Sequence, residues 1–356
     1  MLRGGFGHAF RRLCCIPQCR DAHSCPIGES CPYKQIFEPS PPPGAERLSR
    51  NQDIPRPFIF RPPHSNETHF KRDESFEFEL VLIGRAFEYL PYFVLSFREL
   101  AEGGLGLNRA RCTLDRVWSA AICRRFGTAA VDPGTEGTSQ LSSQQFEYIE
   151  SGDMRGPRRG SRAEVLKSPH SKDSSIALIY SAEDQLFRSV KPLDSSDWIE
   201  SRISQLTSDL RPLISGGSQL TTDHRLLTIH FLTPTHLKSD GQVIREPEFH
   251  HIFKRLRDRL NALSTFFGDG PLEVDFRALG ERSEKIKKVA GQFQWLDRTR
   301  TSSKTGQRHE LSGFVGEATY EGELEEFLPW LVMGELVHVG KHTAWGNGRF
   351  VVKSQM

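Results

Sequence analysis

The stretch Leu328–Lys353, L-P-W-L-V-M-G-E-L-V-H-V-G-K-H-T-A-W-G-N-G-R-F-V-V-K, decides the expected fold. Its apolar start predicts a short helix, Gly340–Gly348 predicts a glycine-punctuated loop, and Arg349–Lys353 predicts a closing strand. The same order of strand, Leu-Pro-aromatic, helix, Gly-rich loop and basic strand occurs once earlier, ending near Trp118. A duplicated unit explains this repetition better than one large fold does.

The second copy has room for every element of a β-α-β-β-α-β unit. Leu226–Leu232 predicts its first strand, and an apolar stripe from Phe249 to Phe267 predicts a long helix. Gln292–Trp295 and Leu311–Tyr320 predict the next two strands. The basic block Lys254–Arg259 falls opposite the apolar stripe, so we expect it to face solvent.

The first copy is shorter. Gly4–Leu13 is compatible with a helix, Phe76–Gly84 predicts a strand, and apolar residues between Phe87 and Ala101 predict an amphipathic helix. Only three residues precede the Gly4 turn, so the first strand has no sequence, and the chain is expected to begin about one strand too late. The expected fold class is therefore α+β, with two tandem ferredoxin-like (RRM-like, β-α-β-β-α-β) domains, the first lacking its first strand.

The remaining segments set the expected boundaries. Residues 38–64 are Pro-rich and predict an extended surface crossing, because proline lacks the amide donor of a ladder. Residues 127–175 are rich in Gly, Ser, Thr and charge and predict a long loop. We expect an N-terminal domain with a Cys-rich loop at 1–126, an insertion at 127–222 and a C-terminal domain at 223–356.

Composition excludes some classes of protein. No run approaches the ~18 apolar residues of a membrane helix, and no apolar segment typical of a secretory signal follows the N-terminus. A cytoplasmic location and no membrane partner follow by default. The net charge is only +2 over 356 residues, so bulk charge does not indicate nucleic acid. The basic residues nevertheless gather in short blocks, which permits one basic face.

Several stretches carry a family resemblance. L-T-I-H-F-L-T-P-T-H-L-K (Leu227–Lys238), G-F-V-G-E-A-T-Y-E-G (Gly313–Gly322) and Gly334–Phe350 resemble the RAMP-superfamily endoribonucleases that process CRISPR precursor RNA. R-G-G-F-G-H-A-F-R-R, C-P-Y-K-Q-I-F-E and P-R-P-F-I-F-R-P-P resemble the branch with a cysteine-bearing loop, as does the stretch from Tyr89 to Gly106. The order of the matches, spanning both domains, makes the resemblance specific.

The resemblance implies an endoribonuclease without a catalytic cofactor. Its ribose 2′-hydroxyl would attack the adjacent phosphate of a CRISPR repeat, leaving a 2′,3′-cyclic phosphate, and no small-molecule substrate is implied. The family places its catalytic histidine in or just after the first helix, which here selects His8 and His23. Histidine suits both proton steps because its ordinary pKa is ~6.5. Arg11, Arg12 and Lys34 are candidate charge partners; alternatively, both histidines are structural or surface residues.

The Gly-rich loop is the main candidate for RNA contact. Glycines permit positive φ and close backbone approach, so amide N–H groups can point at phosphates. An aromatic residue can stack a base. The alternative is a tight turn whose glycines serve only the backbone. The candidate RNA-binding residues are Gly340, Lys341, His342, Trp345, Gly346, Gly348 and Arg349 of the loop, with Arg298 and Arg300 before it.

Five of the seven cysteines lie in the first 31 residues. Cys15, Cys19, Cys25 and Cys31 supply four thiols, the number of ligands in a structural zinc site. Their spacing is looser than paired C-x-x-C motifs, and reduced cysteines packed as small apolar groups are the alternative. The odd total of seven cysteines, spread this unevenly along the chain, argues against a disulfide framework.

Two other classes of protein remain open. A non-catalytic RNA-binding scaffold subunit of a CRISPR effector complex would share the fold and the Gly-rich loop, and would lack a histidine poised at the scissile phosphate. A metal- or redox-responsive protein would explain the cysteine loop and leave the Gly-rich loops unexplained.

Overall fold

The largest sheet in the computed structural model has four antiparallel strands in the order β12-β5-β11-β8. They are β5 (Arg225–Thr235), β8 (Lys287–Leu296), β11 (Gly313–Gly322) and β12 (Phe350–Ser354). Helix α6 (Phe249–Phe267) connects β5 to β8, and helix α8 (Leu328–Val337) connects β11 to β12. These connections make one complete β-α-β-β-α-β unit.

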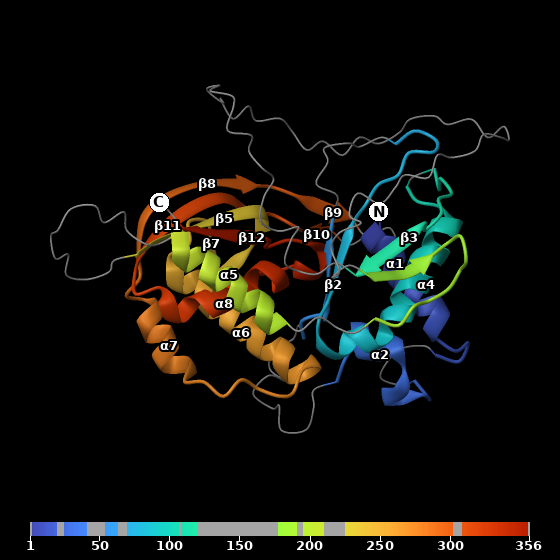
Figure 1. The fold of residues 1–356 in the computed structure, drawn as a ribbon, viewed down its shortest axis with the longest axis horizontal. Coiled ribbons are helices and arrows are strands. Elements are labelled where there is room, and N and C mark those ends of the chain that lie inside the picture. Colours follow the sequence, from blue (N-terminus) through green and yellow to red (C-terminus); the bar gives the residue numbers. More distant parts are fainter. Residues whose placement is uncertain are drawn as a thin grey trace. The chain divides into compact units, whose positions relative to one another are not determined.

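The structure describes residues 2–19, 25–40, 54–62, 70–106, 108–119, 177–190, 195–209, 225–301 and 308–354 (Figure 1). The chain divides into two compact units. The first combines Met1–Leu13, Pro63–Glu77 and Pro91–Leu193, and the second combines Cys14–Pro62, Phe78–Leu90 and Asp194–Met356. The boundaries at 1–126, 127–222 and 223–356 stay a prediction.

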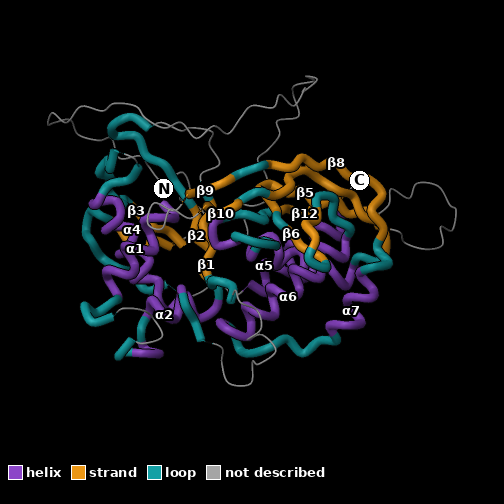
Figure 2. The backbone as a smooth tube through the Cα atoms, turned by 180° about the vertical axis from the view of Figure 1, so that it is seen from behind, coloured by secondary structure: helices purple, strands orange, loops and turns teal. Residues whose placement is uncertain are grey.

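One face of the four-stranded sheet forms the core of the second unit. Residues two apart along a strand share a face, and the register places the side chains of three strands together on this one. Helices lie against it in both ribbon views, and Phe249 of α6 meets the ring of Tyr320 edge to face at 5.5 Å (Figures 1 and 2). The buried strand residues are Leu227, Ile229, Phe231, Ala318, Tyr320, Phe350 and Val352.

A short strand in the Pro-rich segment corrects one prediction. Residues 38–64 were expected to be an extended surface crossing, yet β1 (Phe58–Arg61) is fully buried and pairs antiparallel with β2 (Glu79–Leu82). The prediction was wrong there because prolines flank β1 without entering it, so all four of its amides remain. β1 and β2 both belong to the second unit.

Smaller elements complete the second unit. Its short hairpins are β6 (Leu237–Ser239) with β7 (Gln242–Ile244), and β9 (Thr299–Thr301) with β10 (Arg308–Glu310). The other helices among its described residues are η1 (Gly28–Ser30), α2 (Pro32–Phe37), η2 (Gly84–Tyr89), α5 (Ser195–Asp209), α7 (Phe276–Ser283), η3 (Glu325–Phe327) and η4 (Thr343–Trp345).

The first unit contains both helices that the sequence predicts, and they pack together. Helix α1 (Leu2–Cys14) places Phe6 against Phe93 and Phe97 of α4 (Leu90–Gly103), with stacked rings at 5.4 and 4.8 Å. Strands β3 (Arg116–Ser119) and β4 (Ala177–Ser181) pair antiparallel. Residues 127–175, predicted to be a loop, lie outside the described residues. None of the described helices is both long and apolar enough to span a membrane.

The α6 core face should dominate the stability of the second unit. Leu256 is fully buried on this helix, so Leu256→Ala should lower the free energy of unfolding by about 2–5 kcal/mol through lost transfer energy and a cavity. Urea unfolding followed by far-UV circular dichroism measures this. Val289→Ala, at a half-exposed position on β8, is the control and should change stability by less than about 0.5 kcal/mol. Equal effects of the two substitutions would contradict this account of the core.

Candidate nucleic-acid interface

A buried arginine lies under the Gly-rich loop. Arg61 ends β1 and is 1% exposed, and its Nη2 donates to the main-chain oxygens of Glu335 and Leu336 at 2.8 and 3.1 Å. Those carbonyls belong to the last turn of α8, where no helical amide reaches them. The cation therefore caps the negative end of the helix dipole. Its Nη1 also lies 3.5 Å from a carboxylate oxygen of Glu79 on β2.

Arg61 also fixes His338, the residue that leads from α8 into the loop. Arg61 Nε donates to His338 Nε2 at 3.1 Å, so this nitrogen carries no proton. The proton is then on Nδ1, which donates to the Asn347 main-chain oxygen at 3.1 Å. Burial, with the nearby Arg61, lowers the pKa of His338 well below its usual range. The ring is therefore neutral, and it ties the two ends of the loop together.

The backbone of His338 is strained. Its φ of 61° and ψ of 173° place it in a region that side-chain-bearing residues rarely adopt. Such a conformation costs about 1–3 kcal/mol, and surrounding contacts must hold it. The two ring hydrogen bonds to Arg61 and Asn347 supply them.

Further charged groups brace the same helix. Glu335 is buried, faces Arg202 of α5 through both carboxylate oxygens at 3.2 and 3.3 Å, and accepts the Val352 amide at 2.6 Å. Arg259 of α6 donates to the Val337 carbonyl at 2.8 Å, and burial lowers its pKa to about 9. The basic block Lys254–Arg259 was expected to face solvent; for Arg259 that was wrong, because the guanidinium turns inward to this carbonyl.

Close packing shapes the loop itself. A Cβ on Gly346 would lie 2.3 Å from the Phe60 carbonyl oxygen, and one on Gly348 would lie 1.8 Å from that of Val339. Both residues have positive φ, 84° and 72°. No other residue type fits at either position, since both the space and the conformation exclude a side chain. The loop is thus pressed onto β1.

Most amides of the loop bond to the protein itself. Lys341 N–H donates to the His236 carbonyl, Gly348 N–H to that of Pro234, and Arg349 N–H to the Thr233 hydroxyl. Trp345, Gly346 and Asn347 donate to carbonyls within the loop. These six amides are not available to bind a phosphate. A phosphate-bearing ligand at the loop would therefore be contacted mainly by side chains.

The side chains at the loop surface form a cationic aromatic group, here called the Trp345 cluster. The ring of His342 stacks on Trp345 with centroids 5.4 Å apart and an interplanar angle of 13°. The Arg300 guanidinium, from β9, lies 5.1 Å from the centroid of Trp345. Lys341 is exposed beside them. An aromatic ring with adjacent cations suits the stacking of a base and the charge of a phosphate.

The structure places the other predicted loop residues differently. Gly346, Gly348 and Arg349 are buried. Burial lowers the pKa of Arg349, whose charge is balanced by Glu79 and Glu335. Gly340 and Arg298 are half-buried. The structure thus brings His342, Trp345 and Arg300 together, with the exposed Lys341 directly before His342 in the chain, and leaves Arg349 in the supporting network.

The candidate catalytic residues lie in the N-terminal part of the chain. His8 is exposed on α1 in the first unit. On the same helix, Arg12 makes an ion pair with Glu99 of α4. Lys34 is buried on α2, in the second unit. His23 lies outside the described residues.

The cysteine loop brings thiols together in pairs. The pKa of Cys19 is raised to about 11 by burial and by interactions with the thiols of Cys25 and Cys15. The Cys25 thiol accepts backbone hydrogen bonds from Ile27 and Gly28, which lower its pKa together with interactions of Cys19 and Cys31. Among the described side chains, no group of three or more His, Cys, Asp and Glu forms a ready-made metal site.

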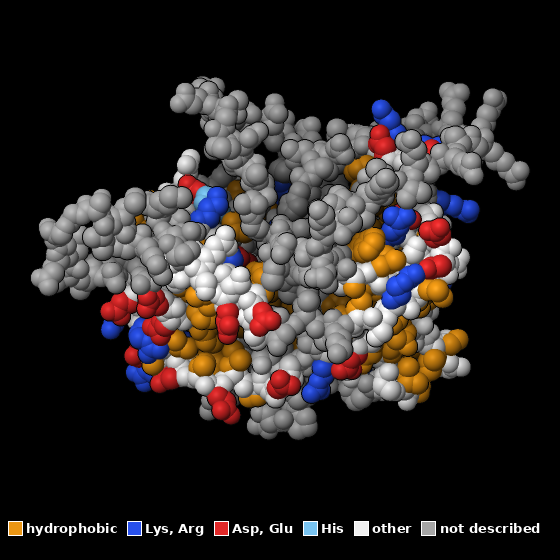
Figure 3. All heavy atoms as spheres, viewed as in Figure 1, with side chains coloured by type: hydrophobic (Ala, Val, Ile, Leu, Met, Phe, Trp, Pro, Cys, Tyr) orange, Lys and Arg blue, Asp and Glu red, His pale blue; other side chains and the backbone are white. Residues whose placement is uncertain are grey.

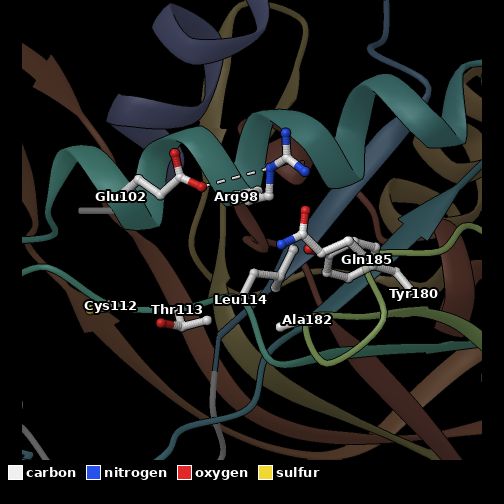
Figure 4. A pocket seen from close by; sticks show the side chains of 8 residues that line it. All are labelled: Arg98, Glu102, Cys112, Thr113, Leu114, Tyr180, Ala182 and Gln185. Carbon is white, nitrogen blue, oxygen red and sulfur yellow. Dashed lines mark ion pairs between the residues drawn. The ribbon is translucent and has the colours of Figure 1, made fainter.

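Two other surface features lie outside the Gly-rich loop. A cavity of about 300 Å³ in the first unit is lined by Arg98, Glu102, Cys112, Tyr180 and Gln185 among others, with an Arg98–Glu102 ion pair at 3.7 Å (Figure 4). It contains no histidine. On the face shown in Figure 3, the described Lys and Arg side chains are interspersed with Asp and Glu and form no large basic patch.

Sequence reasoning missed Arg61, His338 and β1. The signal for β1 was present, because Phe58-Ile59-Phe60 is a run of strand-forming residues between Pro57 and Pro62. No local signal marks Arg61 as buried, since its partner His338 is 277 residues away.

Two models of known families match parts of the chain. A family model described as CRISPR-associated endoribonuclease Cas6 matches residues 229–350, and one described only as an N-terminal domain matches residues 1–136. No curated protein matches the sequence.

Several solved structures of Cas6 proteins are similar to this chain. A Cas6 product complex is 25% identical over 37% of this chain and 52% of its own, with a TM-score of 0.28. Thermus thermophilus Cas6 is 18% identical over 50% and 66%, with a TM-score of 0.30. Another Cas6 product complex is 14% identical over 87% and 86%, with a TM-score of 0.40. The chain spans 52–57% of the length of the first of these Cas6 structures and of two related ones.

The neutral His338 predicts a pH-dependent stability. In the unfolded chain this histidine protonates below about pH 6.5, whereas the folded protein keeps it neutral. The folded state therefore loses stability as pH falls from about 6.5 toward the depressed pKa, by up to about 1.4 kcal/mol per pH unit.

His338→Asn tests this. The Asn amide can still donate to the Asn347 carbonyl and tolerates positive φ. Urea unfolding between about pH 7.5 and about pH 5 should give a shallower loss of stability for the variant than for the wild type. His230, His250 and His251 also have lowered pKa values. Both proteins contain them, so their contributions cancel when the pH dependence of the variant is compared with that of the wild type. Identical slopes would show that His338 is not a buried neutral group.

Proposed function

We propose, from the premise that residues 229–350 are a Cas6 endoribonuclease domain, that this protein cleaves the repeats of precursor CRISPR RNA into single crRNA units. The observation that carries the proposal is the Trp345 cluster, held at the surface of that domain by the Arg61–His338 network. Lys341 and Arg300 offer charge to phosphates, and Trp345 with His342 offers a stacking surface. In this account Gly346, Gly348 and Arg349 shape the loop, and Gly340 and Arg298 lie at its margin.

The proposed chemistry needs no metal. The ribose 2′-hydroxyl attacks the adjacent phosphorus, the P–O5′ bond breaks, and the products carry a 2′,3′-cyclic phosphate and a 5′-hydroxyl. One group removes the 2′-hydroxyl proton and another protonates the leaving 5′-oxygen. His8 and His23 are the candidate proton-transfer residues. Support for His8 is its exposure on α1, where substrate can reach it.

Two parts of the proposal concern architecture and partners. The complete β-α-β-β-α-β unit supports a ferredoxin-like C-terminal domain, and we extend this to a tandem arrangement with a second such domain toward the N-terminus. The partner is the CRISPR repeat RNA. A non-catalytic RNA-binding subunit of an effector complex is the second candidate. The observation that favours it is the Trp345 cluster, which supports RNA binding and does not depend on the catalytic assignments of His8 and His23.

The cleavage test uses labelled repeat RNA in the presence of a chelator. Wild-type protein should produce a fragment ending in a cyclic phosphate, resolved from a linear phosphate by acid treatment and phosphatase. His8→Ala or His23→Ala should lower the single-turnover rate about 10²–10⁴-fold if that residue transfers a proton.

His250→Ala, on α6, is the matched control and should cleave at the wild-type rate. Cleavage that is unchanged in both N-terminal variants would remove those two assignments. Binding without cleavage by the wild type would favour the scaffold function, and neither binding nor cleavage would overturn the proposal.

We also propose that Cys15, Cys19, Cys25 and Cys31 hold a structural zinc ion. Support comes from the interactions between the thiols of Cys15 and Cys19, of Cys19 and Cys25, and of Cys25 and Cys31. Backbone N–H groups of Ile27 and Gly28 directed at Cys25 stabilise a thiolate, the form that binds zinc. Metal binding would have to draw the four sulfur atoms into one tetrahedron.

Metal analysis tests this site independently of cleavage. The purified protein should contain one zinc per chain, and Co²⁺ substitution should give a thiolate charge-transfer band. Cys25→Ser should lose both signals, whereas Cys112→Ser, in the first unit, should keep them. A wild-type protein that binds neither ion on titration would show that these cysteines are packed as reduced thiols.

A further inference from the structure

The cavity of the first unit, here called the α4 cavity, is lined by charged and polar side chains. It lies between one face of α4, the segment from Cys112 to Leu114 that leads into β3, and the turn that follows β4 (Figure 4). Its volume of about 300 Å³ is at the lower end of the range for pockets that hold small ligands. The proposed function assigns this cavity no role.

Helix α4 contributes a cation and an anion side by side. Arg98 and Glu102 are one helical turn apart, and Arg98 Nε lies 3.7 Å from Glu102 Oε1. This separation is longer than a hydrogen bond, so both groups retain hydrogen-bonding capacity for a ligand. The guanidinium can only donate, and the carboxylate can only accept. A bare anion would be repelled by Glu102, so the cavity suits a ligand that presents an acceptor next to a donor.

The turn after β4 adds an amide to the same cavity. Gln185 has a φ of 57°, which residues with a side chain rarely adopt, and its main-chain N–H donates to the Ser181 carbonyl at 2.8 Å. The neighbouring Asp184 accepts the Leu186 amide at 2.9 Å, which also fixes the turn. Strained residues held in this way cluster at ligand sites. Within the described part of the chain, the Gln185 side-chain amide forms no hydrogen bond.

The rest of the lining favours a flat ligand. Leu114, Ala182 and the ring of Tyr180 supply apolar surface, and Thr113 adds a hydroxyl. A nucleobase combines flat apolar faces with an edge on which donors and acceptors stand in fixed order. In guanine, the O6 acceptor lies directly beside the N1–H and amino donors, which matches a cation beside an anion.

We propose that the α4 cavity binds a guanine base. Arg98 donates to O6 and N7, as arginine does when it reads this base in nucleic acids. Glu102 accepts from N1–H and the amino group, and the Gln185 amide, which both donates and accepts, bonds to the same base.

The base belongs either to a guanosine of RNA or to a free guanine nucleotide, since both present the same edge. With RNA as the source, the inference rests on the proposed function and gives the first unit a part in substrate selection. With a free nucleotide as the source, it is independent of that function.

Calorimetric titration of the full chain with GMP tests the cavity. GMP should bind, and AMP should bind about tenfold more weakly, because adenine presents a donor where guanine presents O6. Arg98→Ala and Glu102→Gln should each lower the affinity for GMP by about the same factor. Arg277→Ala is the matched control, since it removes another Arg–Glu pair one helical turn apart, on α7, and it should bind GMP as the wild type does.

Gln185→Gly separates ligand binding from the conformation of the turn. Glycine adopts positive φ without strain, so the melting temperature should stay the same or rise. The variant lacks the side-chain amide, so its affinity for GMP should fall by about tenfold. An affinity equal to that of the wild type would remove Gln185 from the site.

Inosine substitution distinguishes the two sources of the base. The probe is fluorescein-labelled repeat RNA with a 2′-deoxynucleotide at the mapped cleavage position, so that it is not cut. Each guanosine is replaced in turn by inosine, which lacks the amino group. If RNA supplies the base, inosine at one position should weaken binding to the wild type and have no effect on binding to Glu102→Gln. If a free nucleotide supplies it, GMP binds and no position shows this coupling.

Failure of this inference and failure of the proposed function are distinguishable. No binding of millimolar GMP, together with no coupled inosine position, overturns the guanine site. Equal affinities for GMP and AMP also overturn it, as does wild-type affinity for GMP in both Arg98→Ala and Glu102→Gln. A protein that cleaves repeat RNA without a guanine site keeps the proposed function alone. A protein that binds GMP and neither binds nor cleaves repeat RNA keeps the α4 cavity site and loses the proposed function.

Discussion

The arrangement of the second unit depends on one buried cation. Arg61 reaches from β1 to the C-terminal carbonyls of α8 and to the ring of His338, so a single guanidinium joins a strand, a helix end and the start of the loop. A buried charge is stable only when its donors are used and an opposite charge is near. The α8 carbonyls and the nearby Glu79 carboxylate stabilise this charge. The Gly-rich loop therefore has a fixed conformation before any ligand binds.

In the proposed function, a preformed loop contacts RNA through its side chains and not through its backbone amides. Six of its amides bond to the protein, so the glycines serve close packing against β1 and the sheet rather than a phosphate cradle. In the proposed function, side chains of the loop and of β9 supply the contacts instead. Preorganised contacts of this kind lower the entropy lost on binding.

Sequence periodicity predicted the main strands and the connecting helices of the four-stranded sheet in the second unit. The apolar stripe of α6 follows directly from residue spacing, and so do the alternating core positions of β5, such as Ile229 and Phe231. Periodicity could not predict Arg61, because whether an arginine is buried depends on a partner far along the chain. It also could not show that Arg349 is internal while Lys341 is exposed, since both stand in one basic, glycine-rich segment.

The strain at His338 has a physical role in this arrangement. Its backbone adopts a conformation that glycine would adopt more easily, yet glycine would supply no ring to join Arg61 to the Asn347 carbonyl. The ring bonds offset the backbone cost only while the imidazole is neutral, because a proton on Nε2 would face the guanidinium donor. The geometry of the loop, and with it the position of the Trp345 cluster, is consequently linked to the protonation of a fully buried residue.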